Sequence, residues 1–188
     1  MPENTTARTV AASADHGKLD IQALVLLAVL LAAGFILNFT VGKAISGISG
    51  GLISPEFIIS AFCLTILVVR PNAIQALIIG LISAAVIQVT TTSPFIDFAA
   101  EGIAAMLMSL IVAAGMRGSA KKFVPLVGAF ATTVVSGVIF MLIKIAMVGS
   151  AAQLAAAMLP VVLITGVFNA ILVSALYLPI KKALKLDD

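Results

Sequence analysis

Six apolar segments follow one another along this chain, and they constrain its fold more than any other feature. A helix needs about 20 mostly apolar residues to cross the hydrocarbon core of a bilayer, which is about 30 Å thick. The segments that meet or approach this length are 21–39, 53–69, 73–89, 95–116, 123–148 and 154–178. The chain is 62% hydrophobic and only 10% charged, whereas about a quarter of the residues in a soluble domain are charged. The sequence therefore predicts an all-α integral membrane protein with six transmembrane helices.

Short polar stretches separate these segments and predict where the helices begin. Ser54-Pro55-Glu56 is expected to start the second helix, because Ser caps, Pro suits the first turn and Glu favours the positive end of the helix dipole. Ser93-Pro94 is expected to open the fourth helix, after Arg70-Pro71-Asn72 has ended the second. The Gly- and Ser-rich stretch 40–51, which contains Lys43, opposes a stable helix and is expected to be a mobile loop, either a lid or a re-entrant segment.

The placement of Lys and Arg predicts the orientation of the bundle. Cytoplasmic loops carry an excess of these residues. One side would carry only Lys43, and the other side would carry Arg8, Lys18, Arg70, Arg117, Lys121, Lys122, Lys181, Lys182 and Lys185. Both termini are therefore expected in the cytoplasm. Residues 1–20 would form a flexible tail, residues 21–180 the membrane domain and residues 181–188 a short C-terminal tail.

Polar residues gather at the outer ends of the predicted helices. Counting at about 1.5 Å per residue places most of them within the outer turns, with Asn169 deeper, near the midplane. The candidate substrate-binding residues are Asn38, Lys43, Glu56, Gln88, Thr91, Asp97, Glu101, Lys144 and Asn169. Polar groups at membrane depth are costly and commonly mark a functional site. Because the inner halves carry almost no ionisable group, the pattern predicts a site that opens outward.

Each of these residues also has a structural explanation. Glu56 and Lys144 could extend toward the interface, Asp97 could satisfy the helix dipole, and Asn169 could bond a neighbouring helix. Asp97 and Glu101 are four residues apart and so share one helix face. Lys144 opposite these carboxylates would suit a zwitterion or a polar heterocycle, or would form an internal ion pair. Stacking on a bound ring would depend on phenylalanines, with Phe39, Phe57, Phe95, Phe98 and Phe168 as the candidates.

Several classes of function are not expected. A single Cys (Cys63) and a single His (His16) exclude an intrachain disulfide and a Cys/His metal site. No pairing of nucleophile and base predicts an enzyme, and no cofactor is expected. The net charge of +3 comes from basic residues at the ends of apolar segments, so it does not indicate nucleic-acid binding. The chain also lacks a phosphate-binding Gly-rich loop ending in Lys-Ser/Thr.

The stretch Ala28-Val29-Leu30-Leu31-Ala32 has an Ala-x-x-x-Ala pattern on the first predicted helix. This pattern, the size, the six segments, the Gly-rich first outer loop and the outer polar cluster resemble the substrate-specificity subunits (S components) of energy-coupling factor (ECF) transporters. The resemblance implies a multi-pass protein of the prokaryotic plasma membrane that binds a vitamin or similar micronutrient. It also implies that Ala28 and Ala32 dock on a transmembrane coupling subunit, which works with two cytoplasmic ATPases.

The identity of the substrate is left open by the sequence. The turn Thr90-Thr91-Thr92-Ser93-Pro94, followed by an acidic helix, is similar to tryptophan-type S components. No motif selects among tryptophan, riboflavin, thiamin, biotin, folate and cobalamin. An autonomous secondary transporter or small channel is the alternative, and it would need polar groups in the inner halves as well. A structural or assembly subunit without a small ligand is a third class.

Overall fold

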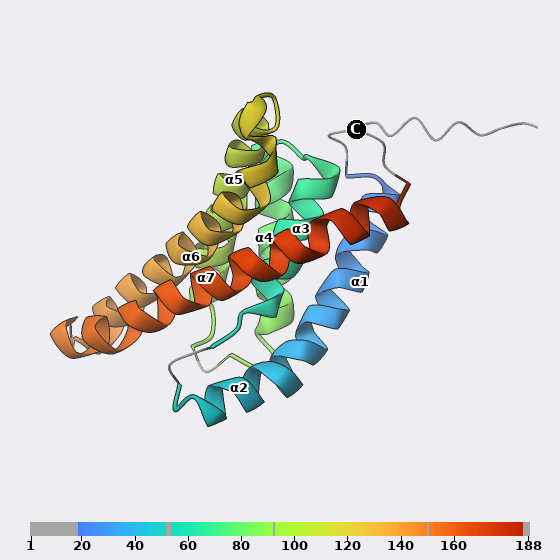
Figure 1. Cartoon of the computed structure of the whole chain (residues 1–188). Helices are drawn as coiled ribbons and strands as arrows, with labels where there is room; N and C mark the ends of the chain where they lie inside the picture. Colours follow the sequence, from blue (N-terminus) through green and yellow to red (C-terminus); the bar gives the residue numbers. More distant parts are fainter. Residues whose placement is uncertain (1–18, 52–53, 92, 150, 186–188) are drawn as a thin grey trace, which may run out of the picture.

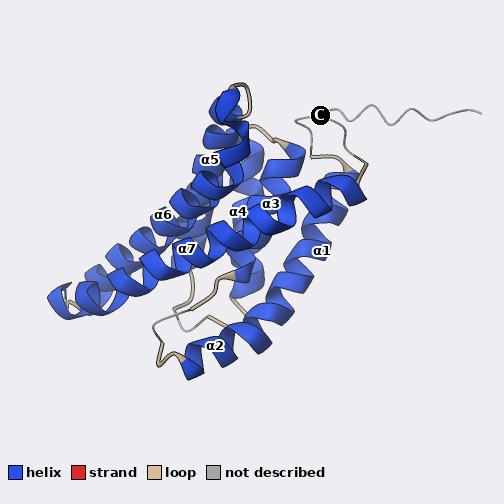
Figure 2. Ribbon diagram, in the orientation of Figure 1, coloured by secondary structure: helices blue, strands red, loops and turns tan. Residues whose placement is uncertain are grey.

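The computed structural model describes residues 19–51, 54–91, 93–149 and 151–185, and this part of the chain contains helices and no strands (Figures 1 and 2). The predicted all-helical class is therefore confirmed. The elements are α1 (Ile21–Leu37), η1 (Asn38–Gly42), α2 (Lys43–Ile48), α3 (Phe57–Val69), α4 (Ala73–Ile87), α5 (Ile96–Gly115), η2 (Ser119–Phe123), α6 (Val124–Val148) and α7 (Ala151–Ala183).

Four helical stretches are long and apolar enough to cross a membrane: Ile21–Ile48, Ile96–Gly115, Lys121–Val148 and Ala151–Ala183. They are compatible with a multi-pass membrane protein. The apolar helices α3 and α4 have only 13 and 15 residues, which correspond to about 20 and 22 Å of length. Each of the six apolar segments thus forms a helix, whereas six membrane crossings and cytoplasmic termini remain predictions.

Helix α3 is the centre of the bundle. Every residue from Phe57 to Val68 is buried, and α3 contacts α1, α4, α5, α6 and α7. The pairs α4–α5, α5–α6 and α6–α7 pack side by side around it. Figure 1 shows α7 crossing in front of α3, with α1 on the opposite flank from α6. Because no side of α3 faces outward, its length need not match a bilayer.

The outer surface of the bundle is strongly apolar. Large side chains that are more than half exposed include Val25, Val29, Ile36, Leu110, Leu142, Val167 and Ile171. These residues lie on α1, α5, α6 and α7, which are the helices of membrane-spanning length. Soluble monomers rarely expose large contiguous apolar patches. The distribution suits helices that face lipid.

Glycines allow two very close helix contacts near the end of the bundle where α3 begins. A Cβ atom at Gly80 on α4 would lie 2.5 Å from the carbonyl oxygen of Glu101 on α5. One at Gly34 on α1 would lie 2.9 Å from the carbonyl oxygen of Phe57 on α3. Neither position has room for a side chain, so the backbones are in direct contact. These contacts fix the positions of Phe57 and Glu101 along the bundle axis.

The prediction of a mobile loop at 40–51 was wrong. The helix that starts at Ile21 continues through the π-helical turn η1 and through α2 to Ile48. A glycine costs a helix only about 1 kcal/mol, and extending an existing helix requires no new nucleation. The chain turns only at Gly50 and Gly51, whose φ values of 62° and 85° are readily adopted by glycine.

Candidate functional site: a polar cavity at the start of α3

A cavity of about 400 Å³ lies where α3 begins. Its walls come from η1 and α2 on one side, α5 on another, and α6 and α7 on a third, with one residue each from α3 and α4. Its polar lining residues are Asn38, Lys43, Ser46, Ser54, Glu56, Thr90, Thr91, Asp97, Glu101, Thr133, Ser136 and Thr165. Small-molecule sites commonly have volumes of about 300–1,000 Å³, so the cavity is large enough for a micronutrient.

Asn38 organises the part of the cavity wall nearest to α3. Its side-chain Oδ1 accepts a hydrogen bond from the backbone N–H of Phe57 at 2.9 Å, and its Nδ2 donates to Glu56 Oε2 at 3.5 Å. The first N–H of α3 is therefore capped by a side chain from η1. The prediction that Ser54-Pro55-Glu56 starts this helix was wrong, because the helix begins only at Phe57. Glu56 occupies the capping position without capping, and its carboxyl group lines the cavity.

Asn169 on α7 supports this wall from behind. Its side chain is fully buried and does not line the cavity. Its Nδ2 donates to the Glu56 carbonyl oxygen and to Thr133 Oγ1, both at 3.2 Å. Thr165, one turn earlier on α7, donates to the Ser54 carbonyl oxygen at 3.0 Å. The Asn169 amide therefore fixes the segment that carries Glu56 from outside the cavity, and its contact with a substrate stays a prediction.

Asp97 and Glu101 both line the cavity from α5, as their shared helix face predicts. Asp97 Oδ2 accepts a hydrogen bond from Gln88 Nε2 at 3.3 Å. Gln88 Oε1 in turn accepts one from the backbone N–H of Phe95 at 3.0 Å. Gln88 itself does not line the cavity. It holds Asp97 and the start of α5, which begins at Ile96, one residue after the expected start at Phe95.

Glu101 is the least satisfied polar group of the site. Its side chain is only 3% exposed, and its Oε2 is buried with no hydrogen-bond partner. No described Lys or Arg lies within salt-bridge distance of it. A buried acceptor without a partner costs about 1–3 kcal/mol, and native proteins contain few such groups. Glu101 therefore has a hydrogen-bonding capacity that a bound molecule could satisfy.

The two lysines proposed for the site lie in different environments. Lys43 lines the cavity, and its Nζ lies 4.2 Å from the centre of the Phe39 ring, which also lines it. Lys144 does not line the cavity, and its Nζ lies 5.5 Å from the centre of the Phe140 ring. The expectation that Lys144 faces the carboxylates is not met. The positive charge in the cavity comes from Lys43.

The wall formed by α6 and α7 was missed by sequence reasoning. It consists of Thr133, Ser136, Gly137 and Phe140 on α6 and of Met158, Val161, Val162 and Thr165 on α7. Both sets recur at spacings of three or four residues, which place them on one helix face. This periodicity of small, hydroxyl and aromatic residues is the sequence signal that could have indicated the wall. Of the predicted phenylalanines, Phe39 alone lines the cavity.

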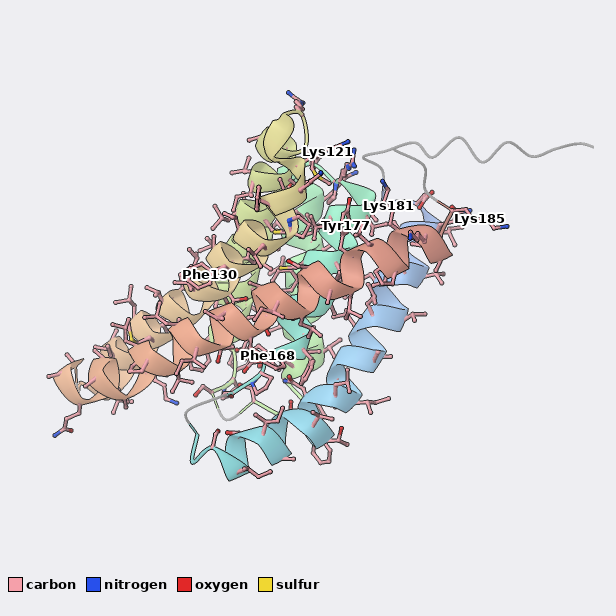
Figure 3. The ribbon with its side chains drawn as sticks, viewed as in Figure 1. Lys121, Phe130, Phe168, Tyr177, Lys181 and Lys185 are labelled. Atoms are coloured by element: carbon pink, nitrogen blue, oxygen red, sulfur yellow. The ribbon has the colours of Figure 1, made fainter. Side chains whose placement is uncertain are left out.

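Phe57 and Phe168 form a contact that supports the site without lining it. Their rings pack edge to face, with centres 5.9 Å apart and planes at 88°. Figure 3 shows Phe168 on the stretch of α7 that passes this part of the bundle. Phe95 is largely exposed, and Phe98 does not line the cavity either. Stacking on a bound ring would therefore fall to Phe39 and Phe140.

Among the described residues, no group of three or more His, Cys, Asp or Glu side chains is arranged to hold a metal ion. Cys63 is a free, buried thiol inside α3. His16 lies outside the described residues. Ala28 and Ala32 are both exposed on α1, so this small-residue face is accessible to another protein.

Comparison with protein-family models found no match, and comparisons with curated proteins and with solved structures found no significant similarity.

Proposed function

We propose that this chain is the substrate-binding membrane subunit, or S component, of an ECF-type importer for a micronutrient. The observation that carries the proposal is the 400 Å³ cavity containing the unpartnered carboxyl group of Glu101. A buried cavity with convergent polar groups is the usual form of a small-molecule site. The proposal places this cavity toward the outside of a prokaryotic plasma membrane, with six crossings and both termini in the cytoplasm.

The lining suggests what kind of molecule would bind. The carboxyl groups of Glu56, Asp97 and Glu101 face one cavity, where Lys43 is the described cation. A ligand that donates hydrogen bonds, such as an amine or a protonated heterocycle, would satisfy the carboxylates. A carboxylate on the same ligand would pair with Lys43, and a ring would fit the apolar wall near Phe140. A tryptophan-like zwitterion has all three features.

Beyond the cavity, α3 carries Ile58, Phe62 and Ile66, which are fully buried and apolar, and its buried polar side chains, Ser60 and Thr65, are uncharged. An autonomous transporter or channel would need polar groups along a continuous route. We therefore expect import by this chain to require coupling to other subunits. Uptake of substrate by proteoliposomes that contain this chain alone would favour the autonomous transporter instead.

Ligand retention tests the proposal directly. We expect the purified chain, without other subunits, to carry a small molecule that native mass spectrometry detects and that solvent extraction releases. Glu101→Gln should lower retention by at least tenfold, because the buried carboxylate would no longer accept charge-assisted hydrogen bonds. Lys144→Gln is the matched control and should retain the molecule, since Lys144 lies outside the cavity. Equal retention by both variants, or none by the unmodified chain supplied with a broad micronutrient panel, would contradict the proposal.

The docking face can be tested separately. Ala28 and Ala32 lie within about 40° of each other around α1 and are both exposed. Small residues let another helix approach closely, so Ala28→Trp or Ala32→Trp should abolish coupled uptake and leave ligand retention intact. Ala33 is also exposed but lies about 100° from Ala32. Ala33→Trp should therefore preserve uptake, and loss of uptake in this control would remove the assignment of the docking face.

A further inference from the structure

A second, smaller cavity lies at the opposite end of the bundle from the candidate substrate site. It has a volume of about 190 Å³ and is lined by Arg70 and Pro71 from the turn between α3 and α4, and by Ser109, Met116 and Arg117 at the end of α5. Two arginines from different turns thus line one small cavity. The proposed function makes no use of this cavity.

Arg70 is held in a costly backbone conformation at the edge of this cavity. It ends α3 in the left-handed region, with φ 54° and ψ 51°. An L-residue with a side chain pays about 1–2 kcal/mol there, and glycine or asparagine is the usual choice at such a helix end. The Nε atom of Arg70 is buried and has no hydrogen-bond partner. An arginine at this position therefore carries both a strained backbone and an unsatisfied donor.

The turn that carries Arg70 is fixed to α5. Ser109 Oγ donates a hydrogen bond of 2.7 Å to the carbonyl oxygen of Pro71, and this bond is buried. Arg117 follows α5 by two residues and is exposed. The hydrogen bond keeps the two arginines on either side of one cavity, so the site is built before any ligand arrives.

The described chain supplies no anion to this cavity. Of its four carboxylates, Asp20 caps α1 by accepting from the N–H of Ala23 at 2.8 Å, and the other three line the substrate cavity at the far end. Apart from Ser109, whose hydroxyl bonds Pro71, the rest of the wall is apolar and comes from Pro71, Val112, Ala113 and Met116. An anion that entered would face two guanidinium groups with no described carboxylate competing for them.

We propose that Arg70 and Arg117 bind the phosphate group of a phosphate ester in this cavity. Guanidinium groups present a planar fork of N–H donors that matches phosphate oxygens. The same end of the bundle carries Lys181 and Lys185 (Figure 3), and basic pockets among transmembrane helices bind anionic lipid headgroups. The phosphate can come from such a lipid or from a soluble phosphate ester, and the two sources share this chemistry.

Native mass spectrometry of the full chain in a neutral detergent tests the site. Phosphatidylglycerol and phosphatidylcholine are added separately, and bound lipid is counted. We expect one tightly held phosphatidylglycerol, preferred at least tenfold over phosphatidylcholine. Arg117→Gln should reduce this preference about tenfold and, because Arg117 is exposed, should fold normally. Arg70→Gln together with Arg117→Gln should abolish it. The matched control, Lys121→Gln with Lys122→Gln, removes the same charge nearby and should leave the preference unchanged.

Competition with glycerol 3-phosphate separates the two sources. If millimolar glycerol 3-phosphate displaces phosphatidylglycerol and raises the melting temperature of the unmodified chain but not of the Arg117→Gln variant, the site takes soluble phosphate esters. If glycerol 3-phosphate does neither, the site binds phosphate only as part of a lipid headgroup. The proposal is overturned if the unmodified chain shows no preference for phosphatidylglycerol. It is equally overturned if the lysine control loses as much preference as the arginine variants, because diffuse charge would then explain the binding.

Discussion

Glu101 offers a direct way to separate a ligand-binding role from a structural one. Its carboxyl group is 3% exposed, and its buried Oε2 has no partner in the described structure. If the Glu101 carboxyl group is paired only when a ligand is bound, it destabilises the ligand-free protein. Replacing Glu101 with Met, an unbranched apolar residue of similar length, should then stabilise the ligand-free chain.

The magnitude follows from the missing hydrogen bond. An unsatisfied buried polar group costs about 1–3 kcal/mol, and a volume-conserving core substitution usually costs less than about 1.5 kcal/mol in packing. Because the 400 Å³ cavity beside Glu101 can take up the small difference in volume, we expect the packing cost to be at the low end. Glu101→Met should therefore raise the free energy of unfolding by about 1–2 kcal/mol.

The assay is reversible unfolding in mixed micelles, with the loss of helical circular dichroism followed as sodium dodecyl sulfate is added. Ligand retention is measured on the same preparations. Glu101→Gln is the control, since its amide still places a polar group in the same position and should give little or no gain in stability. A loss of 1 kcal/mol or more in Glu101→Met would mean that Glu101 makes a structural contact. Undiminished ligand retention in this variant would refute its role in binding.

Two further predictions concern the frame of the site. Gly80→Ala should destabilise the chain by about 1–3 kcal/mol, because its Cβ would lie 2.5 Å from the Glu101 carbonyl oxygen. Gly47→Ala, where a Cβ meets nothing within 4 Å, should instead gain about 0.5–1 kcal/mol, and equal effects in the unfolding titration would exclude close packing as the cause. Asn38→Ala should cost about 1–2 kcal/mol by leaving the Phe57 N–H uncapped. An unchanged unfolding free energy for this variant would show that another group caps α3.

The helices could be predicted from the sequence because each apolar run is long, whereas their ends depend on distant partners. The N–H group that starts α3 bonds Asn38, which lies 19 residues earlier in the chain. The residue before α5, Phe95, bonds the side chain of Gln88. The local signal at Ser54 predicted an earlier start for α3, since a sequence pattern cannot show that a cap comes from a neighbouring element. The sequence pattern also did not predict α2, because α2 continues a helix that α1 has already nucleated.

The sequence predicted correctly which residues share a helix face. It did not predict how far along the bundle axis each residue lies. Asp97 and Glu101 share a face of α5 and do line the cavity. Lys144 follows Phe140 by four residues, so it continues the cavity-facing stripe of α6 with a rotation of only about 40°. It lies about 6 Å farther along the axis, beyond the edge of the cavity. Counting from predicted helix ends therefore placed Lys144 near the correct face of α6 but at the wrong position along the bundle axis.

The space that forms the cavity lies beyond the first residue of α3, which is a short helix. With 13 residues this buried helix is about 20 Å long, whereas α6 and α7, with 25 and 33 residues, are about 38 and 50 Å long. Since Gly34 fixes the start of α3 against α1, α3 cannot slide to fill the space beyond its first residue. The longer helices enclose that space, and the polar groups at the start of α3 and α5 face into it. The cavity is therefore a consequence of helix lengths and close backbone contacts.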